Sequence, residues 1–240
     1  MVAALYDIGA RERIRDRIAE IERQIDSNSY RPGPWDKLLK DARMLPREDR
    51  EALKEEFTRV SSKLHRRDGK RTLSFMTGFV AEVGLTIVGG VLLMFAIHNL
   101  SNLLGILAAG IWMMTFQPLV KIGLGHLLGV GYEYVYFNGA EPRFKMRFGD
   151  YLAAPRWARI MLHLSGTIGS PLGVWLVQVC LPSDLRIAID VCWVLFWLVV
   201  VVNTVGFFVA LAGMRKLGPM RATASSGGSA ALELREALEL

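Results

Sequence analysis

Four long apolar stretches dominate the chain after residue 72. They run over residues 73–97, 103–127, 157–181 and 185–213. Each is longer than the roughly 18 residues that distinguish a membrane-spanning helix from a buried helix of a soluble protein, and each can cross a hydrocarbon core of about 30 Å. The pattern therefore predicts four transmembrane helices.

The first 71 residues have a different pattern, in which apolar side chains recur at helical spacing among many charges. Two sets repeat the spacing 4, 3, 4, which places each set on one face of a helix. A segment over 27–34 contains Pro-Gly-Pro and separates the sets, and a short helix over 35–44 follows it. We expect a helical hairpin whose stripes close on each other or pair between protomers. The two sets are Ile14, Ile18, Ile21 and Ile25, and Leu53, Phe57, Val60 and Leu64.

Charge is concentrated in the same N-terminal part. Residues 1–71 hold 18 of the 29 Lys and Arg and 14 of the 23 Asp and Glu. The apolar content of 52% excludes a disordered chain. Residues 1–71 carry both positive and negative charges, and the other basic residues border apolar stretches. The net charge of +6 therefore favours anionic lipid headgroups over nucleic acid as a partner.

The segments that join the apolar stretches differ in charge. The connections over 98–102 and 182–184 contain no Lys or Arg, whereas the other flanks are basic. The positive-inside rule then places both termini in the cytoplasm. The prediction is an all-α, multi-pass integral membrane protein with an antiparallel four-helix bundle and a cytosolic helical hairpin. Its parts are a cytosolic domain over 1–71, a membrane domain over 72–214 that includes an interfacial cytoplasmic loop over 128–156, and a flexible tail over 215–240.

Each predicted span brings a polar side chain to a similar depth from its cytoplasmic end. Glu82 is the clearest case, because an ionisable group in hydrocarbon costs several kcal/mol unless it is paired. The layer is either a hydrogen-bond network that fixes helix register or a cavity. In the cavity, Glu82 would be the general base and His163 would shuttle a proton. The other members of the layer are Gln117, Lys121 and Asn203.

Basic and apolar residues alternate strictly near the end of the 128–156 loop. If this run is extended, its cations lie on one face and its apolar side chains on the other. At a membrane surface the aromatics would enter the headgroup region and the cations would meet phosphates. The sequence leaves open whether this is ordinary anchoring or a clamp for a substrate phosphate. The candidate contacts are Arg143, Lys145 and Arg147, with Tyr132, Tyr134, Arg156 and Arg159 nearby.

Metal binding is a weaker hypothesis. Two histidines with a carboxylate suit Zn or Fe(II), but the chain has no HExxH, and a divalent metal is the one cofactor considered. No GxSxG, Walker A or GxGxxG pattern is present, so the sequence does not decide whether the protein is an enzyme. The metal candidates are His126, His163, Glu133 and Asp150, with Glu82.

The functional expectation is a membrane protein that binds a lipid-like amphiphile through the polar layer and the basic aromatic loop, and in the enzymatic form of the hypothesis also processes it. One alternative is a non-enzymatic oligomeric scaffold or assembly factor, whose N-terminal helices contact a second copy or a partner membrane protein. Another is a proton-coupled transporter or an oligomeric channel. Two small-residue patterns would let helices approach closely, within or between protomers. They are Gly125 with Gly129, and Ser165 with Gly169 and Gly173.

Overall fold

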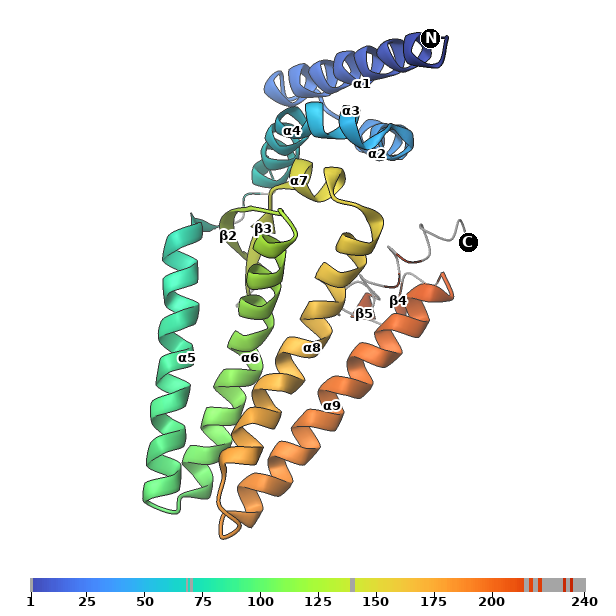
Figure 1. The fold of residues 1–240 in the computed structure, drawn as a ribbon. Coiled ribbons are helices and arrows are strands. Elements are labelled where there is room, and N and C mark those ends of the chain that lie inside the picture. Colours follow the sequence, from blue (N-terminus) through green and yellow to red (C-terminus); the bar gives the residue numbers. More distant parts are fainter. Residues whose placement is uncertain are drawn as a thin grey trace. The chain divides into compact units, whose positions relative to one another are not determined.

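The computed structural model describes residues 2–67, 69, 71–138, 141–213, 216–217, 220–221, 231 and 234. The chain is mostly helical and divides into two compact units (Figure 1). We call them the head unit, formed by Met1–Leu73 and Gly129–Pro155, and the membrane unit, formed by Ser74–Leu128 and Arg156–Leu240.

Helices of the head unit enclose a small apolar core. The predicted stripes of α1 and α4 pack together within one chain, so they close on each other. The helical segment predicted to carry the second apolar set is interrupted at Leu53, whose side chain is buried in this core. The helices are α1 (Val2–Asp26), α2 (Pro34–Met44), α3 (Arg47–Ala52) and α4 (Lys54–Arg67).

A β-hairpin follows the second long helix, and here the all-α prediction was wrong. Strands β2 (Tyr132–Asn138) and β3 (Glu141–Met146) pair antiparallel, and β1 (Thr72–Ser74) lies on the other side of β2. Aromatic and β-branched residues fill β2, and alternation with period two is the strand pattern. The sequence indicated the extended conformation of β3 but not its partner.

The segment that contains the hairpin belongs to the same compact unit as the N-terminal helices. Helix α7 (Phe148–Ala153) follows β3 and packs on α3 and α4. The Gly149 amide donates a hydrogen bond of 2.9 Å to Thr58 Oγ1. Leu152 lies in the same apolar core as Phe57.

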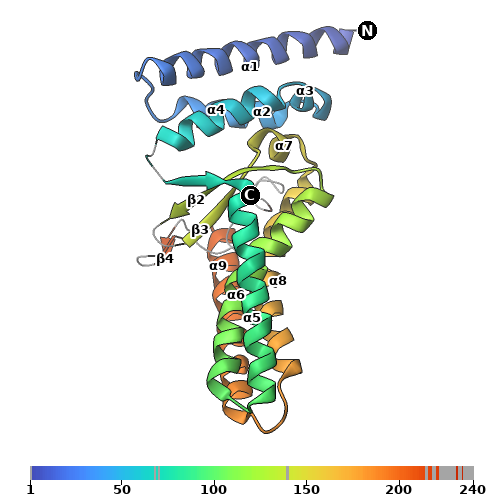
Figure 2. The same cartoon turned by 90° about the vertical axis from the view of Figure 1, so that its left-hand side faces the viewer.

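Four helices of the membrane unit are long and apolar enough to cross a membrane, which confirms the four predicted long apolar helices. Their ends differ from the predicted ones by at most two residues. Helix α6 contacts the other three, and Figures 1 and 2 show the four lying side by side. They are α5 (Phe75–His98), α6 (Asn102–Leu127), α8 (Arg156–Cys180) and α9 (Arg186–Leu211).

Two glycines let α8 approach α6 at backbone distance. A Cβ on Gly169 would lie 2.6 Å from the Gln117 Cα, and one on Gly173 would lie 2.5 Å from the Trp112 carbonyl oxygen. This small-residue ridge therefore packs helices within one chain. The predicted helix contact at Gly125 and Gly129 was wrong. Gly129 has φ 75° and lies beyond the end of α6, where it terminates the helix.

Beyond α9 the structure describes a short hairpin of β4 (Lys216–Leu217) and β5 (Met220–Arg221). Apart from these strands and residues 231 and 234, the predicted tail over 215–240 lies outside the described residues.

Candidate functional site

Glu82 lies on the face of α5 that is turned into the membrane unit. The side chain is only 6% exposed, and among the described residues its carboxylate makes no hydrogen bond or ion pair. One turn on, the Thr86 carbonyl accepts a hydrogen bond of 2.9 Å from Trp112 Nε1 of α6. The buried residues of α5 are Gly78, Glu82, Gly89, Leu93 and Ala96, which form one helical stripe.

Three basic side chains gather where α6 packs on α8. Lys121 of α6 and Arg159 of α8 both act electrostatically on His163 of α8, at the contact of these two helices. Arg159 and His163 are one turn apart on the same face of α8. Arg159 is buried, with 4% of its surface exposed. We call these three residues the basic cluster.

Gln117 continues this polar strip one turn from Lys121 on α6. Its side-chain oxygen accepts a hydrogen bond of 3.2 Å from Ser170 Oγ of α8. The close approach of Gly173 to Trp112 follows one turn further on. Close packing at these two turns holds the strip in place, so the basic cluster lies next to a rigid helix contact.

The two residues expected to act as acid and base are not brought together. Among the described residues no charged group acts on Glu82, whereas the cations of Lys121 and Arg159 act on His163. Asn203, the member of the layer on α9, donates a hydrogen bond of 3.0 Å to the Val199 carbonyl of its own helix. Of the polar layer expected from the sequence, Gln117, Lys121 and His163 lie at the contact of α6 with α8.

The basic residues near the β-hairpin bind partners within the head unit. Lys145 Nζ donates a hydrogen bond of 2.8 Å to Ser61 Oγ, and burial lowers the pKa of this lysine. Arg147 bonds to Glu55 and lies 3.3 Å from Asp150, which also accepts a hydrogen bond from the Gly131 amide. These two cations therefore lie against groups of their own chain. The remaining cation, Arg143, pairs in register with Tyr136 of β2. Arg156, the first residue of α8, is exposed.

Tyr132 and Tyr134 of β2 line a polar groove of about 600 Å³ in the head unit. The Tyr134 hydroxyl and His65 Nδ1 share a hydrogen bond of 3.0 Å, and burial raises the pKa of Tyr132 and Tyr134. Glu133, between the two tyrosines, accepts a hydrogen bond from Ser62 of α4. The sequence reasoning missed the α4 residues Ser61, Ser62 and His65, because nothing in the helical pattern signals a strand packed on that face.

No metal centre is assembled in the part of the chain that the structure describes. No three His, Cys, Asp or Glu side chains gather there closely enough to hold an ion. Of the candidates, His126 and His163 belong to the membrane unit, whereas Glu133 and Asp150 belong to the head unit and bind Ser62 and Arg147.

Four helices of this length and hydropathy, with a charged head unit, define a multi-pass membrane protein. Comparison with protein-family models, with curated proteins and with solved structures found no match. Its function is therefore inferred from the residues of the site.

Proposed function

We propose that this protein binds an anionic, lipid-like amphiphile within the membrane, with the headgroup at the basic cluster. The basic cluster carries the proposal, because the buried Arg159 and its neighbour His163 on α8 lie at the contact with α6, which holds Lys121. Cations close to the ends of membrane helices attract anionic headgroups. A phosphate or carboxylate headgroup would bind at the basic cluster, and its chains can lie on the apolar helix faces.

The membrane orientation that fits this site is the one that the basic flanks predict. We propose an antiparallel bundle with both termini and the head unit in the cytoplasm. Lys121 lies six residues before the end of α6 and Arg159 three residues after the start of α8. At about 1.5 Å per residue both are within about 9 Å of these helix ends. Anionic lipids are enriched in the cytoplasmic leaflet, which the cluster would then face.

Binding without chemistry is proposed, because the acid and base of the enzymatic hypothesis do not meet. His163 has cationic neighbours, and Glu82 has no partner among the described residues. Lys145 and Arg147 are left out of the proposed lipid site, because Ser61 and Glu55 already bind them.

Thermal unfolding in detergent, with and without added lipid, tests the proposal. Phosphatidylglycerol should raise the unfolding temperature of the wild type by several degrees, and phosphatidylcholine should not. Arg159→Gln should abolish the difference, whereas Arg159→Lys should retain part of it. Arg186→Gln is the matched control, because it removes one cation from another membrane helix. Equal stabilisation by both lipids, or an unchanged response of Arg159→Gln, would contradict the proposal.

A further inference from the structure

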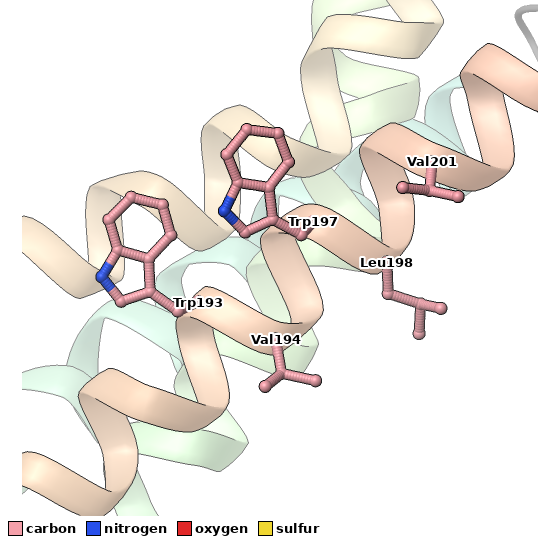
Figure 3. A pocket seen from close by; sticks show the side chains of 5 residues that line it. All are labelled: Trp193, Val194, Trp197, Leu198 and Val201. Carbon is pink, nitrogen blue, oxygen red and sulfur yellow. The ribbon is translucent and has the colours of Figure 1, made fainter.

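Helix α9 turns most of its apolar surface away from the rest of the membrane unit. Only 11% of its most apolar window is buried, compared with 50% for α8. Trp193 and Trp197 lie on this outer surface and are 46% and 55% exposed. Their rings stack at a centroid distance of 6.3 Å and an interplanar angle of 11°, and Figure 3 shows them side by side along the helix.

Both tryptophans lie deep in the span, which is unusual for this residue. They follow Arg186, the first residue of α9, by seven and eleven positions. At about 1.5 Å per residue they are about 10 and 16 Å from that helix end, and Trp197 is thus near the middle of the membrane. Tryptophan is enriched at membrane interfaces, where its N–H finds an acceptor. Within the described residues neither indole N–H donates a hydrogen bond, and lipid tails offer no acceptor.

Asp190 supplies a hydrogen-bond acceptor, its carboxylate, on the same surface of α9. It is exposed and precedes Trp193 by three positions, so both side chains lie on one face of α9. In the described part of the chain its carboxylate has neither an ion pair nor a hydrogen bond. A carboxylate one turn inside a span is costly when it faces lipid. The outer face of α9 thus carries an acceptor and a donor, one turn apart, that no described residue of the same chain pairs.

We infer that this face binds α9 of a second copy of the chain. In a parallel two-fold pair, Asp190 of each copy accepts a hydrogen bond from the partner subunit's Trp193, and the contact is made twice. This self-complementarity is what selects a second copy over lipid. The tryptophans border an apolar hollow of about 460 Å³, which would receive side chains of the partner. Its lining residues are Trp193, Val194, Trp197, Leu198 and Val201 (Figure 3).

Disulfide cross-linking in native membranes tests the pairing. A two-fold axis along the membrane normal brings equal residues of the two helices to the same depth, so Val194→Cys should cross-link to itself. The background carries Cys180→Ala and Cys192→Ala, since these are the two cysteines of the chain. Val80→Cys on α5 is the matched control, because Val80 is also an exposed apolar residue of a span, at 62% exposure. A dimer with Val194→Cys but not with Val80→Cys is expected. No dimer, or equal yields, would overturn the inference.

The hydrogen bond between the copies is tested separately by single-molecule photobleaching in nanodiscs. The wild type should bleach in two steps. Trp193→Phe keeps the ring and removes the N–H, and Asp190→Ala removes the acceptor. Each should shift most molecules to one step without lowering the unfolding temperature of the monomer. One-step bleaching of the wild type, or two-step bleaching of both variants, would contradict the proposed contact.

Discussion

The Nη2 atom of Arg147 lies 2.7 and 2.8 Å from the two carboxylate oxygens of Glu55, although the residues are 92 positions apart. The ion pair links the segment after β3 to α4. Two residues further on, the Gly149 amide donates to Thr58 of the same helix. These contacts tie the chain between the second and third spans to the N-terminal helices and make both parts of one folded unit.

Gly149→Ala should damage this unit more than loss of the ion pair. A Cβ at Gly149 would lie 1.7 Å from the Lys54 carbonyl oxygen, so α7 could not keep its place on α4. We expect the free energy of unfolding of the head unit to fall by at least about 2 kcal/mol, as for other overpacked sites. Hydrogen exchange of the α4 and α7 amides measures the change.

Glu55→Gln is the comparison for that experiment. Glu55 and Arg147 have 62% and 37% exposed side chains, and an exposed ion pair contributes less than about 1 kcal/mol. Equal losses of protection in the two variants would show that α7 does not contact α4 closely.

Lys145 should make the stability of the head unit rise with pH. Burial lowers its pKa from the ordinary 10.5, against the attraction of Glu133. Between the lowered pKa and 10.5 the unfolded chain binds more protons than the folded one, so the free energy of unfolding rises with pH across that window. Lys145→Met lacks this titration.

Denaturant unfolding between pH 7 and 10 compares the wild type with Lys145→Met. The wild type should gain stability relative to the variant as the pH rises. A difference that stays constant with pH would mean that Lys145 is not buried in the folded state.

Gly173→Ala should separate α6 from α8. A Cβ there would lie 2.5 Å from the Trp112 carbonyl oxygen and 3.2 Å from the Phe116 Cβ. The unfolding temperature in detergent should fall by several degrees, and lipid discrimination by the basic cluster should weaken with it. Gly110→Ala is the control, since nothing lies within 4 Å of a Cβ at Gly110. If both variants unfold like the wild type, the ridge does not pack these helices within one chain.

Glu82→Gln should leave the protein folded. The carboxylate is buried and has no partner among the described residues, so a neutral amide of the same shape removes no interaction. We expect an unfolding temperature equal to or above that of the wild type, with lipid binding retained. A drop of several degrees would reveal a partner of the carboxylate and would restore a role for Glu82 in the site.

The spans could be predicted from the sequence because their length and composition are local properties. The β-hairpin could not be predicted, because it depends on the pairing of β2 with β3 and on their packing against α4. The sequence around Lys145 and Arg147 does not indicate that Ser61 and Glu55 are their partners. The distance of each polar residue from its helix end was equally accessible from residue counting. The rotation of each helix was not, and it decides that His163 of α8 comes within electrostatic reach of Lys121 of α6.

Native mass spectrometry of the gently extracted protein tests the central claim most directly. The wild type should retain an anionic lipid in a fixed ratio to the protein, and Arg159→Gln should lose it while Arg186→Gln keeps it. A wild type that carries no lipid, or the same lipids as Arg159→Gln, would contradict headgroup binding at the basic cluster.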